Sequence, residues 1–173
     1  MNTKKRELLH QLEVSGARSK ELNAITYYTM ENPETLFDWA VENGYLLHGS
    51  PKLFPVIEPR QASDTKRPLG SLNAVYMSKN PLTSMTKTIL GNSRSGYRFE
   101  RDKSGKLIYY NIYIDDLNKL NQEGYMYIVD SKVSDGIADG DHVSYKPVMP
   151  LAIVKFSRQN LKLNIQENTN IKP

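Results

Sequence analysis

Apolar residues recur at helical spacing in three stretches of the first half of the chain. Two of these stretches begin with an asparagine-proline pair. This pair suits a helix start because asparagine can cap the free N–H groups and proline has no N–H to leave unpaired. A glycine lies within two residues of the end of each stretch, where it suits a helix end. The pattern predicts helices over residues 4–14, 33–43 and 81–90.

The segment from Ser19 to Met30 has a mixed pattern. Its apolar residues stand in loose helical register, whereas residues 25–28 have the β-branched and aromatic composition of an extended strand. We predict a helix over this segment and keep the strand at residues 25–28 as the alternative.

β-branched and aromatic residues in short runs are concentrated in the second half of the chain. The runs predict strands over residues 45–47, 74–78, 106–114, 125–129, 142–145 and 151–156. The connections between them are polar or rich in proline. Residues 52–72 are predicted to be irregular, residues 92–105 a polar loop, and Asp115 the cap of a short helix.

Because helices come first and strands follow, the order of elements predicts an α+β fold: N-terminal helices and then a mixed, mostly antiparallel β core. We divide the chain into a helical extension over residues 1–32, a main domain over 33–163 and a polar C-terminal tail over 164–173.

Composition narrows the classes of protein to consider. The chain has 173 residues, 39% of them hydrophobic and 24% charged, as in ordinary soluble domains. No run of apolar residues is long enough to span a membrane, and the N-terminus lacks the apolar core of a secretion signal, so we expect a cytoplasmic protein with no membrane partner. With no cysteine, thiol catalysis and disulfides are excluded. The net charge of +4 favours anionic partners such as a phosphate-bearing molecule.

The strand over residues 45–47 runs directly into His48, Gly49, Ser50 and a proline. This histidine is therefore expected at the end of a strand, beside a glycine that a ligand can approach closely. Later in the chain, Tyr76 stands on a predicted strand, and Ser84 lies in the helix that follows it.

An acidic cluster near residue 140 does not fit a calcium loop, because an EF-hand counted from Asp135 requires a glutamate where the chain has Lys146. The last acid of the cluster, Asp141, enters a late predicted strand instead.

The arrangement of these residues resembles the ADP-ribosyltransferase family. It consists of His48-Gly49 at a strand end, Tyr76 on the next strand and an acid entering a late strand. The branch in question has a His-Tyr-Glu signature and includes diphtheria-toxin-like toxins and poly-ADP-ribose polymerases. The resemblance covers roughly residues 44–157 and departs from the family at the acid, which is Asp141 where the family usually has glutamate.

The resemblance implies the family's split β-sheet and a cleft that binds NAD, used as a substrate. It implies that His48 bonds a ribose hydroxyl, that the backbone of Gly49 pairs with the nicotinamide amide, and that Tyr76 stacks on the nicotinamide ring. Ser50 and Ser84 are carried over as neighbours of NAD, and Asp141 as the catalytic acid. Arg60, in the loop after the histidine, is a candidate phosphate contact by its charge.

The expected reaction is transfer of a single ADP-ribose to an acceptor, protein or nucleic acid, that the sequence does not identify. A toxin role follows from the family analogy alone. The main alternative is a catalytically inactive module of the same fold that binds a nucleotide or a protein. A tRNA 2′-phosphotransferase is a further one, although the arginine and histidine positions of that family cannot be placed in this chain.

Overall fold

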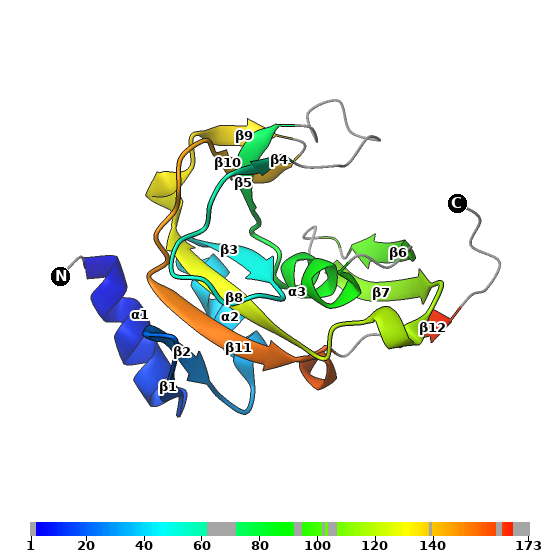
Figure 1. Cartoon of the computed structure of the whole chain (residues 1–173), viewed down its shortest axis with the longest axis horizontal. Helices are drawn as coiled ribbons and strands as arrows, with labels where there is room; N and C mark the ends of the chain where they lie inside the picture. Colours follow the sequence, from blue (N-terminus) through cyan, green and yellow to red (C-terminus); the bar gives the residue numbers. More distant parts are fainter. Residues whose placement is uncertain are drawn as a thin grey trace.

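The computed structural model describes residues 3–61, 72–91, 95–101, 103, 107–138, 140–161 and 164–167. Its α-helices are α1 (Thr3–Val14), α2 (Pro33–Glu42) and α3 (Pro81–Leu90), and short 3-10 helices cover Leu117–Lys119, Ser131–Val133 and Arg158–Asn160. The strands form three sheets (Figure 1). The expected α+β class is therefore confirmed.

The first sheet has five strands in the order β1 (Arg18–Leu22), β2 (Ile25–Thr29), β11 (Ala152–Ser157), β8 (Glu123–Asp130) and β3 (Tyr45–Ser50). Within it, β2 and β11 are parallel and the other pairs are antiparallel.

The second sheet has the order β4 (Arg60–Gln61), β5 (Asn73–Met77), β10 (Asp141–Ser144) and β9 (Gly136–Ala138), all antiparallel. The third has the order β12 (Asn164–Glu167), β7 (Leu107–Ile114) and β6 (Ser95–Arg101).

Among the described residues, one isolated β-bridge joins the first sheet to the second. Leu47 of β3 and Ser78, just after β5, exchange backbone hydrogen bonds of 3.0 and 2.8 Å, and the two strands diverge on either side. Figure 1 shows β4, β5, β9 and β10 gathered at one end of the molecule, away from β8 and β11. The edge strand β3 of the first sheet is thus linked by this bridge to the end of β5 in the second sheet.

The two faces of β3 belong to different cores, because successive side chains of a strand point to opposite faces. Tyr45 and Leu47 are buried in the larger core with side chains of all three α-helices. Leu46 is buried in a second core with Val75 and Met77 of β5. The side chain of His48, two residues after Leu46, follows Leu46 into this second core.

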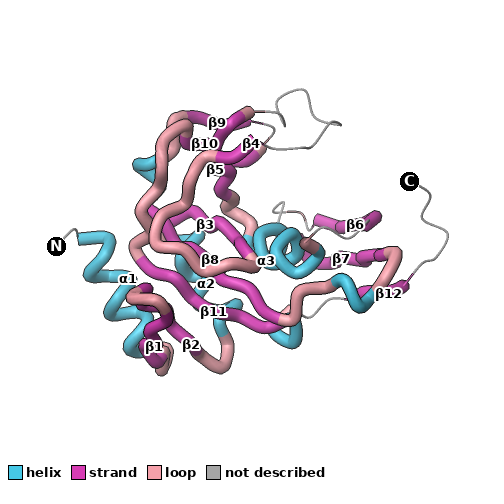
Figure 2. The backbone as a smooth tube through the Cα atoms, in the orientation of Figure 1, coloured by secondary structure: helices cyan, strands magenta, loops and turns pink. Residues whose placement is uncertain are grey.

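Helix α3 lies between β3 and the third sheet, as the tube view shows (Figure 2). The Asn80 side chain caps its first turn by accepting a hydrogen bond of 3.2 Å from the Thr83 N–H, as its asparagine-proline start predicts. Helix α2 also begins at its proline, but Asn32 makes no such capping bond. Among the described residues, no helix has the length and apolar character needed to cross a membrane.

Several sequence-based predictions of local structure are wrong. Residues 18–29 form the hairpin of β1 and β2 rather than a helix, because Asn23 and Ala24 adopt positive φ angles of 50° and 60° in a tight turn and release two extended arms. Residues 1–32 are therefore not purely helical. The alternative of a strand at residues 25–28 is confirmed by β2.

Residues 92–105 were predicted to be a polar loop. Between residues 95 and 101 the structure instead shows a strand, β6, because this segment pairs with β7. Asp115 does not cap a helix. Asp116 does so, by accepting from the Asn118 N–H over 2.9 Å at a single 3-10 turn. The polar C-terminal tail contains a strand, since β12 pairs with β7 in parallel, and residues 168–173 lie outside the described part.

Candidate functional site

His48 links the two separating sheets. Its Nδ1 lies 2.8 Å from the backbone carbonyl oxygen of Tyr76 on β5. A carbonyl oxygen only accepts hydrogen bonds, so Nδ1 carries the proton and donates it. Burial lowers the pKa of the imidazole below 6.5, the bond to Tyr76 opposes this shift, and the positive charge of Arg60 adds to the lowering. His48 is therefore neutral at pH 7, with Nε2 as a hydrogen-bond acceptor.

An aromatic stack holds the segment after β3 against His48. Tyr127 of β8 lies edge-on to the His48 ring, with 5.9 Å between centroids, and stacks on Phe54 at 4.7 Å. The Tyr127 hydroxyl accepts from the Phe54 N–H over 2.9 Å and donates to the Lys52 carbonyl over 2.8 Å. Arg60 lies over the other side of this stack, with its guanidinium 5.7 Å from the Phe54 centroid. The stack thus keeps a cation near His48.

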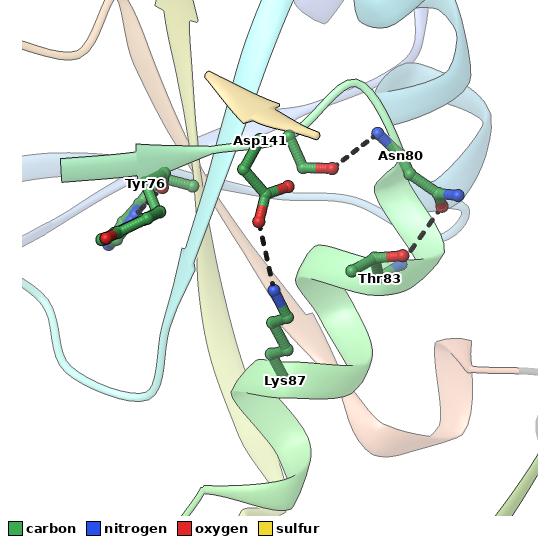
Figure 3. A network of polar contacts seen from close by, with 7 residues as sticks. Tyr76, Asn80, Thr83, Lys87 and Asp141 are labelled. Carbon is green, nitrogen blue, oxygen red and sulfur yellow. Dashed lines mark hydrogen bonds and ion pairs between the residues drawn. The ribbon is translucent and has the colours of Figure 1, made fainter. Parts of the chain in front are cut away.

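Tyr76 and Asp141 share one face of the second sheet. Tyr76 is paired with Val143 of β10, and Asp141 lies two residues before Val143 on the same strand. Directly paired residues and residues two apart point to the same side. In Figure 3 the Asp141 carboxylate points towards α3, where its Oδ2 lies 3.4 Å from the Lys87 Nζ.

Gly49 and Ser84 meet at a close contact between β3 and α3. A Cβ on Gly49 would lie 2.5 Å from the Ser84 carbonyl oxygen and 2.1 Å from the Thr88 Oγ1. The glycine is thus required by the approach of the helix, whether or not a ligand contacts its backbone. Ser84 is buried, and its carbonyl accepts a 2.8 Å hydrogen bond from Thr88 Oγ1.

The Ser50 side chain belongs to the turn after β3. It is buried, and its Oγ accepts a 3.1 Å hydrogen bond from the Lys52 N–H. The hydroxyl thus stabilises the turn that leads into the aromatic stack.

The structure therefore groups the sequence-predicted residues by position. His48 contacts the Tyr76 backbone and lies close enough to Arg60 for the arginine charge to lower its pKa, and Asp141 lies on β10, the strand beside that of Tyr76. Gly49 and Ser84 lie at the contact between β3 and α3, and the Ser50 side chain bonds the chain just after β3.

Sequence reasoning missed Tyr127, Phe54 and Lys87. Lys87 lies one helical turn after Ser84, a spacing that could have drawn attention to it. Tyr127 stands in the middle of a strand, and the loop that its hydroxyl holds begins 75 residues earlier, at Lys52. No local pattern in the sequence indicates that contact.

Comparison of the chain with known proteins gives no match to a family model, to a curated protein or to a solved structure. Among the described residues there is no group of three or more His, Asp and Glu side chains arranged to hold a metal ion. The interpretation of the site therefore depends on its own geometry.

Proposed function

We propose that this chain is an ADP-ribosyltransferase-like protein that binds NAD and transfers a single ADP-ribose to an acceptor. One observation carries the proposal: His48, Tyr76 and Asp141 stand on β3, β5 and β10, which are successive neighbours in space, and His48 donates a hydrogen bond to the Tyr76 carbonyl. The presence of two separate sheets, linked where the edge strand β3 meets the end of β5, also supports the split-sheet form of the α+β fold.

The state of His48 suits the binding of a sugar. With Nδ1–H bonded to the Tyr76 carbonyl, a neutral imidazole presents Nε2 as an acceptor, and no hydrogen bond to Nε2 is seen among the described residues. A ribose hydroxyl is a donor and would complete this pair. Arg60, held beside the Phe54 ring, would neutralise the diphosphate of NAD.

Tyr76 and Asp141 would act on the bond that breaks. Cleavage of the nicotinamide-ribose bond places positive charge on the ribose, as in glycoside hydrolysis, and a carboxylate nearby stabilises that charge. Tyr76 would supply an aromatic face for the nicotinamide ring. The electron pair of the bond leaves with nicotinamide, and the acceptor's nucleophile forms the new bond to C1′.

Calorimetric titration of NAD tests the proposal before any acceptor is known. We expect saturable binding to the wild type and a loss of about tenfold or more in Tyr76→Ala, because the variant removes a stacking contact worth on the order of 1–3 kcal/mol. Tyr28→Ala is the control, since Tyr28 is also partly buried but lies on β2, at the far side of the first sheet. Equal affinity of the two variants, or no binding to the wild type up to millimolar NAD, would contradict the proposal.

The inactive module of the same fold remains a second candidate because of Asp141. Its side chain is one methylene shorter than glutamate, and a misplacement of about 1 Å can cost on the order of a hundredfold in rate. Release of nicotinamide by the wild type and by Asp141→Glu separates the candidates. Release of nicotinamide by the wild type supports the enzyme. The inactive module is supported if the wild type binds NAD without releasing nicotinamide and Asp141→Glu gains this release.

A further inference from the structure

A polar pocket lies where β8 begins and β11 ends, apart from the candidate site. Its volume is about 570 Å³, within the range of roughly 300–1,000 Å³ that is usual for sites of small molecules. The described residues that line it are Gln122, Glu123, Ser157, Arg158 and Gln159. In Figure 1, β11 ends at the lower side of the molecule, whereas β9 and β10 lie at the top. None of the five lining residues belongs to the candidate site.

Hydrogen bonds within the protein fix the walls of this pocket. The Arg158 N–H donates to the Gln122 carbonyl over 2.8 Å, which ties the end of β11 to the start of β8. The Asn160 Oδ1 accepts from the N–H and from the hydroxyl of Ser157, over 2.8 and 3.1 Å. The pocket is thus formed before any ligand binds, so that little ordering of the chain opposes binding.

Two of the lining side chains come from the face of the first sheet that carries Tyr127. Glu123 is paired with Ser157, and Tyr127 lies four residues after Glu123 on β8, so the three side chains share one face. Because a strand rises about 3.3 Å per residue, Glu123 and Tyr127 lie roughly 13 Å apart. The pocket is therefore a separate site on the sheet that also carries His48.

Arg158 gives the pocket a positive charge that is not offset. Its side chain is partly buried, and among the described residues no ion pair of its guanidinium is seen. The Glu123 carboxylate is instead paired, since its Oε2 lies 2.7 Å from the Lys155 Nζ. The hydrogen bond to Glu123 raises the pKa of Lys155, although burial opposes the shift, so this pair stays ionised. Two cations and one carboxylate leave one net positive charge at the pocket.

We propose that this pocket binds a small molecule through a carboxylate or phosphate group that pairs with Arg158. A guanidinium presents its N–H donors in a planar fork that matches two oxygens of either group. The side-chain amides of Gln122 and Gln159 both donate and accept hydrogen bonds, so they suit polar groups on the body of such a ligand. The inference is independent of the proposed function, because the pocket uses none of the same residues.

NMR titration of the ¹⁵N-labelled protein without NAD tests the pocket. Benzoate and phenyl phosphate are the anionic probes, and benzamide is the neutral counterpart of benzoate. We expect saturable shifts of the amides of residues 122–123 and 157–159 with the anionic probes and not with benzamide. The comparison of the two anions identifies whether carboxylate or phosphate is preferred.

Inorganic phosphate shows whether the body of the ligand contributes. We expect it to bind more weakly than phenyl phosphate. Equal affinity of the two would mean that the pocket holds an adventitious ion only, and this would overturn the inference. Absence of saturable shifts at the pocket with either anionic probe in the millimolar range would overturn it as well.

Arg158→Met should weaken the binding of the anionic probes by about tenfold or more, the loss expected for a charge-assisted hydrogen bond. Arg18→Met is the control, because Arg18 is an exposed arginine on β1, and β2 separates β1 from β11 in the sheet. Arg60→Met should leave the shifts at the pocket unchanged, which distinguishes the pocket from the candidate site. Equal affinity of the Arg158 and Arg18 variants would rule out the pairing with Arg158.

The pair of Glu123 and Lys155 gives effects of opposite sign. Glu123→Gln removes a negative charge and leaves the Lys155 ammonium without its carboxylate, so the anionic probes should bind about threefold more tightly. Lys155→Met leaves the Glu123 charge without its partner and should weaken the same probes by a similar factor. Both effects should decrease in high salt, because salt screens exposed charges. Unchanged affinity in both variants would show that charge does not govern binding and would contradict the inference.

Discussion

At the scale of single residues, His48 shows how one backbone contact fixes the chemical state of a side chain. The Tyr76 carbonyl selects the Nδ1–H tautomer, and burial lowers the pKa of the ring. The two effects together leave Nε2 as an acceptor at neutral pH. The same histidine on an exposed strand end would titrate near pH 6.5 and exchange between tautomers.

This state gives a pH prediction. The pKa of His48 is lowered in the folded chain, so the unfolded chain binds more protons between the folded pKa and 6.5. Stability is therefore complete above pH 6.5 and falls as the pH decreases through that window, by about 1.4 kcal/mol for each unit of lowering. Imidazole ¹⁵N NMR should show Nδ1–H and a midpoint below 6.5, and urea unfolding should show the decrease in stability.

His142 is the internal comparison for this measurement. Burial and the charge of Lys79 also lower its pKa, while Asp141 opposes the shift, but its Nδ1 lies 3.1 Å from Ser134 Oγ and not at the Tyr76 carbonyl. Replacement of His48 by glutamine should remove the part of the stability loss at low pH that is due to His48. The part due to His142 should stay unchanged. An ordinary midpoint for His48, or an Nε2–H tautomer, would contradict the geometry of the Tyr76 contact.

The sequence indicated several residues of the candidate site but not how they interact. His48 and Tyr76 were found because local composition marks the strands on which they stand. The expectation that His48 ends its strand is wrong, because β3 pairs with β8 as far as Ser50. Tyr127, Phe54 and Lys87 act through partners that are distant in sequence, such as Lys52 for Tyr127 and Asp141 for Lys87. No local sequence pattern indicates which side chains from two different sheets point towards each other.

At the scale of elements, α3 owes its position to small residues. Gly49 on β3 and Gly124 on β8 both face Thr88, and added Cβ atoms would lie 2.1 Å from its Oγ1 and 2.3 Å from its Cγ2. Helix α3 can therefore approach the sheet closely, and this approach brings Lys87 within reach of Asp141. The packing of one helix thus sets the geometry of the candidate site.

A double-mutant cycle tests this packing. Gly49→Ala and Gly124→Ala should each destabilise the fold by about 1–3 kcal/mol through overpacking. Thr88→Ala should relieve Gly124→Ala, whose clash is with the threonine side chain. That relief should be partial, because the Phe156 ring remains 3.0 Å from the Cβ at residue 124. The substitution should not relieve Gly49→Ala, because the Ser84 carbonyl oxygen remains 2.5 Å from the new Cβ. Urea unfolding of the single and double variants measures both couplings.

Gly136→Ala is the control for these glycines, because nothing lies within 4 Å of a Cβ added there. We expect its stability to stay within about 0.5 kcal/mol of the wild type. Equal rescue of both glycine variants by Thr88→Ala would show that α3 moves freely and that its contact with β3 does not fix the site.

A helix or strand can be predicted when the residues that determine it lie within its own sequence segment. Helices α2 and α3 were predicted because proline, asparagine and glycine mark their ends within the sequence itself. The strands β1 and β6 were missed because most of their residues are polar or charged, and what makes them strands is pairing with β2 and β7. For such segments the partner decides the conformation, and the partner is not visible in a local window.

At the scale of the whole molecule, the N-terminal segment is part of the main core. Leu8 and Leu12 of α1 are 0% and 1% exposed and belong to the core that includes Tyr45 and Leu47 of β3. The Tyr45 hydroxyl donates a 2.7 Å hydrogen bond to the Lys4 carbonyl, and burial together with the charge of Glu7 raises the pKa of Tyr45 to about 12. These contacts predict that α1 unfolds together with the sheet rather than as a separate arm.

Substitution of Leu8 measures that coupling. Leu8→Ala should destabilise the whole chain by about 2–5 kcal/mol, because it removes a fully buried side chain and leaves a cavity. Leu22→Ala is the control within the same segment: Leu22 is 47% exposed on β1, so its loss should change stability by about 0.5 kcal/mol or less. Urea unfolding followed by the fluorescence of Trp39 in α2 and by far-UV circular dichroism should give coincident transitions for both variants.

If α1 were an independent arm, Leu8→Ala would melt the helix alone, and the Trp39 transition would stay at its wild-type midpoint. A shared shift of both signals would instead mean that the helix stabilises the core from which β3 presents His48, so that changes at the N-terminus reach the candidate site through stability.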